Sequence, residues 1–290
     1  MAEPVRDTIA GLRDIADRYD GFIFDVWGTI YDGAEVFPEV PRVFEELRRR
    51  GKRVVFLSNS PQLPSVVGER LSRIGIAPAL YDGIVTSGGE ACRQLSQPSL
   101  PEMQRFKGKV YQTGPDRFPD TLPNHGFPCS ETVAGAAWIL NAGPNQPPDT
   151  LADYEGRLAE GAARGLPMLC ANPDRIVLHG GETHICAGAL AERYEALGGD
   201  VVYIGKPYGL VFERCGDTFE TIRPARTLMI GDNLETDIRG ANSYGCPSLL
   251  IASGVHGLSN ADGAVKIDVL AGLEQSLKAR PDHVIGRLRW

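Results

Sequence analysis

The sequence lacks any long apolar stretch. No uninterrupted hydrophobic run in its 290 residues approaches the ~20 residues that a helix needs to cross a bilayer. Residues 1–20 carry charges throughout and contain no apolar segment of the kind found in signal peptides. We therefore expect a soluble, intracellular protein that resides in the cytoplasm.

Paired cysteines and long basic runs are also missing. The six cysteines are scattered without a Cys-x-x-Cys pair, which argues against a zinc site and against a disulfide framework. The formal net charge is -7, and the basic cluster Arg48–Arg50 closes a helical pattern, where cations favour the negative end of the helix dipole. The sequence therefore predicts neither a nucleic-acid partner nor binding to an acidic membrane surface.

What is present is a regular alternation of strands and helices in a chain that is 42% hydrophobic. The short apolar runs 21–26, 54–57 and 84–85 are typical of strands buried on both faces. Between them, apolar residues at helical spacing predict helices over 38–51 and 63–75, each ended by a glycine. This order predicts a parallel α/β sheet with helices on both faces.

The middle of the chain has a different character. From about Gln97 to Gly199 prolines are frequent, although strand-like runs and helical patterns still alternate, the clearest helix being predicted over 183–197. The core rhythm is expected to resume after Asp200, with a strand at Val201–Ile204. We therefore predict an α/β core that is interrupted by an α/β insertion.

Polar side chains directly follow four of the predicted strands. Because ligands of open parallel sheets bind beyond the carboxyl ends of the strands, these residues are the candidates for chemistry. Two converging carboxylates need a cation, and oxygen ligands favour Mg²⁺. A hydroxyl, an amide and a lysine are donors that a phosphoryl group needs. The residues concerned are Asp25, Ser58 with Asn59, Lys206, and Asp232 with Asp237.

The spacing of these residues resembles the motif series of the haloacid dehalogenase-like (HAD) hydrolase superfamily, and the likeness covers nearly the whole chain from Gly21. Further stretches are similar to its subclass IIA, the branch of nitrophenyl phosphatases, pyridoxal phosphatases and sugar-phosphate phosphatases. The motifs are Asp25-x-x-Gly28-Thr29, Ser58-Asn59, Lys206 and Gly231-Asp232-x-x-x-x-Asp237, and the subclass stretches are Asn172-Pro173-Asp174, Cys186-Ala187-Gly188-Ala189-Leu190 and Tyr203-Ile204-Gly205-Lys206-Pro207.

The resemblance implies a Rossmann-like core formed by residues 1–98 and 200–290, with an inserted α/β cap over 99–199 that sets substrate specificity. It implies Mg²⁺-dependent hydrolysis of a small phosphorylated metabolite through an aspartyl-phosphate, with Asp25 as the nucleophile. A homodimer formed through the cap is the assembly that it implies. The identity of the metabolite is not encoded in any motif.

The resemblance also implies a role for each site residue. Asp25, Asp232 and the backbone carbonyl of Trp27 are expected to hold Mg²⁺, with Asn233 and Asp237 orienting that shell. The residues expected to contact phosphate are Ser58, Asn59 and Lys206. Asp174 follows the apolar run Met168–Cys170, so it is expected on a loop at the end of a cap strand, where it either offers a carboxylate to the substrate or builds a tight turn with Asn172. Lys206 is also expected to offset the charge of the nucleophile.

Trp27 departs from the family pattern. Phosphatases of this family usually carry a second aspartate two residues after the nucleophile as general acid and base, and an indole cannot replace it. General acid–base catalysis is typically worth about 10²–10⁴-fold, so poor leaving groups should be hydrolysed slowly. Asp32 is a nearby candidate replacement, and His256 follows a strand on the ligand side.

Two other functions stay open because of this departure. The chain could bind phosphate or a metabolite without turnover, or it could be a dehalogenase, since dehalogenases of the superfamily also carry an aromatic residue at this position. The complete pair Asp232 and Asp237 argues against a dehalogenase, because displacement of halide from carbon needs no metal. Chelator sensitivity separates the dehalogenase from the phosphatase, and steady-state turnover separates the binding protein from both.

Overall fold

The computed structural model describes residues 7–33, 35–114, 126–146, 148–179, 182–260 and 263–290. They form two compact units. The first contains Met1–Ser58, Gly68–Val85 and Pro207–Trp290, and the second contains Asn59–Val67 and Thr86–Lys206. Within the described part of the chain, no helix combines the length and the apolar character needed to cross a membrane.

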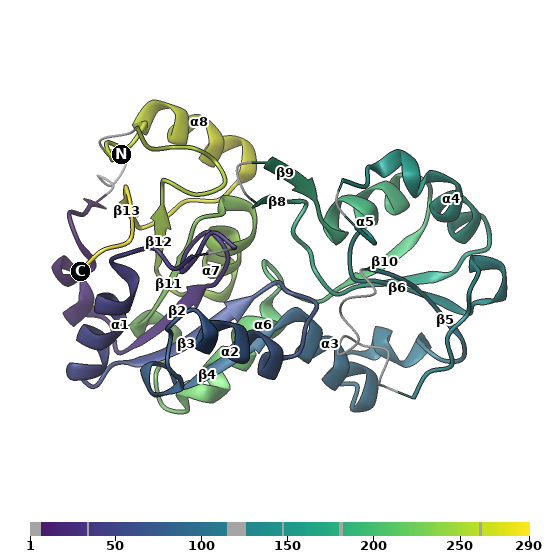
Figure 1. Ribbon diagram of the computed structural model, residues 1–290, viewed down its shortest axis with the longest axis horizontal. Helices are drawn as coiled ribbons and strands as arrows, with labels where there is room; N and C mark the ends of the chain where they lie inside the picture. The colour runs from purple at the N-terminus through teal and green to yellow at the C-terminus, as the bar shows by residue number, and fades with distance from the viewer. Residues whose placement is uncertain (1–6, 34, 115–125, 147, 180–181, 261–262) are drawn as a thin grey trace. The chain divides into compact units, whose positions relative to one another are not determined.

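The first unit is built on a seven-stranded sheet (Figure 1). In spatial order its strands are β1 (Asp7–Thr8), β13 (His283–Ile285), β12 (Ser248–Ile251), β11 (Thr227–Gly231), β2 (Gly21–Asp25), β3 (Arg53–Ser58) and β4 (Gly83–Thr86). All pairs from β1 through β3 are parallel. All five residues of β2 are buried, as an apolar run without alternation predicts for a strand covered on both faces.

Helices cover both faces of this sheet. Successive residues of β2 point to opposite faces. Phe24 therefore packs against Phe44 of α1 (Val40–Arg49), with ring centroids 5.0 Å apart. Ile23 instead joins a buried cluster with Phe212 of α6 (Gly209–Phe219). Burial of each such side chain stabilises the fold by about 1.5–3 kcal/mol. The other α-helices with residues in this unit are α2 (Pro64–Arg73), α7 (Arg239–Tyr244) and α8 (Ile267–Leu277).

The second unit has its own parallel sheet. Its strands, in spatial order, are β10 (Asp200–Tyr203), β7 (Pro167–Cys170), β6 (Trp138–Asn141) and β5 (Val110–Thr113). Tyr194 of α5 (Ala187–Ala196) and Leu158 of α4 (Glu155–Ala163) lie in the core beside Met168 of β7. An antiparallel hairpin, β8 (Ile176–His179) and β9 (Glu182–Ile185), precedes α5. The parallel α/β fold predicted from the sequence is confirmed.

Short turns of 3₁₀ helix join many of these elements, and one turn of π-helix follows β11. The 3₁₀ turns are Leu12–Asp14, Ala16–Arg18, Pro78–Leu80, Pro101–Arg105, Val133–Gly135, Leu151–Asp153 and Pro224–Arg226, and the π-helical turn is Leu234–Ile238. The π-helical turn runs directly into α7. Such turns often occur at functional sites, and this one begins two residues after Asp232.

Two elements differ from their predictions. The strand predicted at Val201–Ile204 is β10, but it pairs with β7, so it belongs to the second sheet and the unit boundary falls after Lys206 rather than near residue 199. The helix predicted over 183–197 begins only at Ala187, because Glu182–Ile185 forms the hairpin with β8. An apolar run specifies a strand but not the sheet that it joins. The functional division into a core and a specificity cap stays a prediction.

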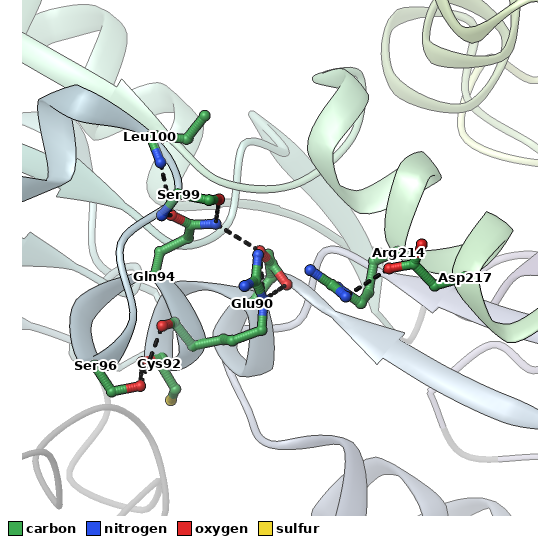
Figure 2. A network of polar contacts seen from close by, with 9 residues as sticks. Glu90, Cys92, Gln94, Ser96, Ser99, Leu100, Arg214 and Asp217 are labelled. Carbon is green, nitrogen blue, oxygen red and sulfur yellow. Dashed lines mark hydrogen bonds and ion pairs between the residues drawn. The ribbon is translucent and has the colours of Figure 1, made fainter.

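A buried polar network fixes the end of α3 (Ser87–Ser96), as Figure 2 shows. The Gln94 side chain donates to Glu90 Oε1 over 3.0 Å, and its Oε1 accepts the backbone N–H of Ser99 over 2.9 Å. Arg93 Nε donates to Glu90 Oε2 over 2.9 Å, so the buried carboxylate is compensated. The network therefore sets the direction in which the chain leaves α3.

Candidate active site

Three buried carboxylates meet at the carboxyl end of the central sheet. Asp25 ends β2, Asp232 directly follows the neighbouring parallel strand β11, and Asp237 lies in the π-helical turn. One oxygen of each carboxylate lies within 4.8 Å of the others. Three negative charges at this spacing repel one another, and a hard divalent cation with oxygen ligands relieves that repulsion. The donor set therefore fits such an ion.

Glycines allow Asp232 to sit in this position. A Cβ on Gly28, whose φ is +81°, would lie 2.4 Å from Asp232 Oδ2, and a Cβ on Gly254 would lie 2.1 Å from Asp232 Cβ. The backbone N–H of Val255 donates to Asp232 Oδ2 over 2.9 Å. The glycine in Asp25-x-x-Gly28 is thus required both by its left-handed conformation and by the close approach of the carboxylate.

The segment after β11 holds the third carboxylate. The backbone N–H of Asn233 donates to Asp237 Oδ2 over 3.0 Å, and the Asn233 side-chain Oδ1 accepts the N–H of Glu235 over 2.9 Å. A Cβ on Gly231 would lie 2.1 Å from Asp237 Oδ2, which leaves room for glycine alone. Asn233 therefore shapes the turn that carries Asp237, with its side chain acting as a helix cap.

His256 supports the same turn. Its Nε2 accepts the backbone N–H of Leu234 over 3.0 Å. Burial lowers the pKa of His256, and the charges of Glu235 and Asp237 oppose this shift. An accepting Nε2 belongs to a neutral imidazole protonated at Nδ1. This contact gives His256 a structural part in the loop.

The loop after Asp25 carries a pair of aromatic rings. Trp27 is half-buried, and the centroid of its ring lies 5.2 Å from that of the buried Tyr31 ring. The Tyr31 hydroxyl accepts a long hydrogen bond of 3.4 Å from Arg70 Nη1. Burial raises the pKa of Tyr31, Arg70 opposes that effect, and the negative charge of Asp25 adds to it. Tyr31 is therefore a buried hydroxyl within electrostatic range of the nucleophile candidate.

Asp32 occupies a turn. It is exposed, and its Oδ1 accepts the backbone N–H of Glu35 over 2.9 Å. This is the usual local hydrogen bond of an aspartate that opens a turn. Ser58, in contrast, is buried at the end of β3, the strand beside β2, as predicted.

The remaining predicted site residues lie together in the second unit. Asn59 Nδ2 donates to Asp174 Oδ1 over 2.9 Å, and Asn59 Oδ1 accepts the backbone N–H of Lys206 over 2.7 Å. Lys206 is only 2% exposed. Ser87, which was not predicted, donates to Asn59 Oδ1 over 3.2 Å. Because Ser87 follows the end of β4, the rule that selected Asp25 and Ser58 could have found it.

Comparisons with known proteins agree with this architecture. The family model described as Haloacid dehalogenase-like hydrolase matches residues 22–128, and the one described as HAD-hydrolase-like matches residues 203–289. Chronophin of Homo sapiens is 32% identical over 269 residues, covering 90% of each chain. Glycerol-3-phosphate phosphatase of Gallus gallus is 26% identical, covering 88% of this chain and 86% of that protein.

A solved structure extends the likeness to three dimensions. A haloacid dehalogenase-like hydrolase from Brucella suis 1330 superposes with a TM-score of 0.82 and 29% identity, covering 96% of this chain and 98% of that one. The resemblance noted in the sequence motifs is confirmed on both levels. The chain belongs to the haloacid dehalogenase-like hydrolase family.

Proposed function

We propose that the protein is a Mg²⁺-dependent phosphatase that hydrolyses a small phosphorylated metabolite. The observation that carries the proposal is the convergence of Asp25, Asp232 and Asp237 at the carboxyl end of β2 and β11. A relative that covers most of the chain is named as a glycerol-3-phosphate phosphatase, which supports the reaction class.

In the proposed reaction an Asp25 carboxylate oxygen attacks phosphorus and the ester oxygen leaves with the bonding electron pair. Water then attacks the aspartyl-phosphate, releasing inorganic phosphate and restoring Asp25. Ser58 and Lys206 are proposed to donate to phosphate oxygens, and Lys206 also to offset the nucleophile's charge. Bound Mg²⁺ would neutralise charge that develops on the phosphoryl oxygens. Its proposed ligands are Asp25, Asp232 and the Trp27 carbonyl, with Asn233 and Asp237 orienting them.

Trp27 limits which esters react quickly. The leaving oxygen needs a proton unless its own pKa is low, and the indole N–H of Trp27 is too weakly acidic to supply one. We therefore propose that activated esters are hydrolysed well and alkyl esters slowly.

We also propose the partner, the assembly and the cellular compartment of the protein. A small phosphorylated metabolite is the proposed partner, without nucleic acid or membrane, and a homodimer through the cap is the proposed assembly. Cytoplasmic residence is proposed because the six cysteines are free thiols, as is usual in a reducing compartment.

The test is a steady-state assay with an aryl phosphate and a panel of phosphorylated metabolites. Turnover should vanish in chelator, return with Mg²⁺ and fall by several orders of magnitude in Asp25→Asn with the fold intact. Phosphate binding without turnover would support a binding protein instead. Chelator-resistant halide release from a haloacid would support a dehalogenase.

A further inference from the structure

The Asn59 side chain uses its whole hydrogen-bonding capacity on the protein. Nδ2 donates to Asp174 Oδ1 over 2.9 Å and to the Lys206 carbonyl over 3.1 Å. Oδ1 accepts the Lys206 N–H over 2.7 Å and the Ser87 hydroxyl over 3.2 Å. An amide offers two donors and two acceptor positions, so none is left for a ligand. A direct phosphate contact by this side chain, as the sequence suggested, would break one of these bonds.

Two of the four bonds go to the backbone of one residue. Asn59 pairs with both the N–H and the C=O of Lys206, which fixes the orientation of both peptide groups around that residue. The preceding Gly205 is equally confined. Its φ is +139°, and a Cβ added to it would lie 2.3 Å from Ser87 Oγ and 2.5 Å from Pro173 Cδ. The backbone position of the buried Lys206 is therefore fixed both by Asn59 and by the close packing around Gly205.

A third partner, Asp174, belongs to the loop after β7. Asp174 accepts from Asn59 in a charge-assisted bond, which is stronger than a neutral one. The same loop is tied to the start of α5, because the Gly188 N–H donates to the Asp174 carbonyl over 2.9 Å. A Cβ on Gly188 would lie 2.2 Å from the Pro173 carbonyl oxygen. Asn59 thus joins a rigid loop to the backbone of Lys206.

We infer that Asn59 is a positioning residue that couples the Asn172–Asp174 loop to Lys206, so that a carboxylate offered to the substrate and the ammonium offered to phosphate move as one body. The inference rests on the proposed function, in which Lys206 contacts phosphate. It replaces the predicted phosphate contact of Asn59 with an indirect role. A displacement of about 1 Å in a catalytic group can cost about 10²-fold in rate, which is the scale expected when this coupling is lost.

A double-mutant cycle tests the inference with two readouts: turnover of an aryl phosphate, and the Kd of inorganic phosphate measured calorimetrically with Mg²⁺. Asn59→Ala should lower kcat by about 10²-fold and should weaken phosphate binding by about 10-fold. In a Lys206→Ala background the same change should alter either quantity by less than about 3-fold, because the lysine through which it acts is gone.

Asn141→Ala is the matched control. Asn141 is also a fully buried amide of this unit, bonded to the Ala187 carbonyl over 2.8 Å and to the Gly143 N–H over 3.2 Å. It should lower Tm without changing kcat, and its effect should be the same with and without Lys206. Should Asn59→Ala fold poorly, Asn59→Asp replaces the two donors with a negatively charged oxygen that faces the Asp174 carboxylate. Its phosphate affinity should then recover in part when Asp174→Asn supplies a donor to the new carboxylate.

Equal losses from Asn59→Ala in both backgrounds would overturn the inference. Wild-type protein that binds phosphate without turnover would refute the proposed phosphatase, yet the phosphate cycle would still decide the coupling. A wild-type protein that neither binds nor hydrolyses phosphate would overturn both.

Discussion

The indole of Trp27 packs against the phenol ring of Tyr31, with centroids 5.2 Å apart and planes inclined by 60°. Trp27, at the position where the family resemblance implies a general acid, is thus packed against a second aromatic ring. If no group donates a proton, the rate should fall steeply as the pKa of the leaving group rises. We expect Trp27→Asp to raise activity on alkyl phosphates by about 10-fold or more, measured as kcat/KM across a leaving-group series.

Tyr31→Phe is the informative companion variant, because it keeps the ring packing and removes only the hydroxyl. With no proton donor in the wild type, this change should leave the leaving-group dependence unaltered. A flat dependence in the wild type that becomes steep in Tyr31→Phe would contradict the expectation and identify Tyr31 as the acid. A flat dependence that persists in Tyr31→Phe would direct attention to Asp32.

The three clustered carboxylates make a second prediction about stability. Without a cation their mutual repulsion opposes folding, so removing one charge should stabilise the metal-free protein even as it abolishes turnover. In chelator, Asp25→Asn should melt about 2–4 °C above the wild type, the shift expected for about 1 kcal/mol in a chain of this size. Mg²⁺ should raise the wild-type Tm by mass action and raise that of Asp25→Asn much less.

Asp217→Asn provides the control for this prediction. Asp217 is an exposed carboxylate that accepts from Arg214 over 2.6 Å within α6 (Figure 2). Its removal should leave the Mg²⁺-induced shift unchanged. A metal-free Asp25→Asn protein that melts below the wild type would show that the cluster is not under electrostatic strain.

The sequence predicts positions at strand ends but not hydrogen bonds between residues that are distant in the chain. The positions of Asp25, Ser58 and Asp232 at one edge of the sheet could be predicted because buried apolar runs end at them or directly before them, and parallel strands bring those ends together. The hydrogen bonds of Asn59 to Asp174 and Lys206 could not be predicted, because these residues are 115 and 147 positions away from Asn59 in the sequence. No local period encodes such pairing. β10 was placed in the wrong sheet for the same reason, since hydrophobicity marks burial but not the neighbour that provides it.

The pair formed by Asp20 and Arg226 predicts a pH effect on stability. It connects the segments that precede β2 and β11, with Arg226 Nε 2.8 Å from Asp20 Oδ2. The hydrogen bond from Arg226 lowers the pKa of Asp20 from its usual 3.8, against a smaller opposing effect of burial. A depressed folded-state pKa contributes stability above the unfolded value, and this contribution is lost as the pH falls through the folded value.

Asp20→Asn should therefore lower Tm near neutral pH, by only about 1–2 °C because the pair is solvent-exposed. The difference from wild type should shrink as the pH falls below 3.8 and should diminish in high salt. Melting curves across this pH range measure it directly. A difference that grows on acidification would mean that the pair is not ionised as described.

The last prediction separates the two tasks of Asp174. Its Oδ1 accepts from Asn59 Nδ2, so the residue can place Lys206 through Asn59 as well as meet the substrate. Asp174→Asn removes the charge but keeps an acceptor for Asn59, whereas Asp174→Ala removes both. With a small aryl phosphate, which has no group to reach this loop, we expect Asp174→Asn to stay within about 3-fold of wild type and Asp174→Ala to lose about 10-fold. With the preferred metabolite of a phosphate-ester panel, both variants should lose at least about 10-fold in kcat/KM, because the carboxylate that would accept from a hydroxyl or an amine is gone.

Equal behaviour of the two variants on the aryl phosphate would show that the loss of the bond to Asn59 is not felt at Lys206. A lower Tm with unchanged kinetics on both substrates would instead leave Asp174 as part of a tight turn, in which its own N–H donates to Asn172 Oδ1 over 3.1 Å.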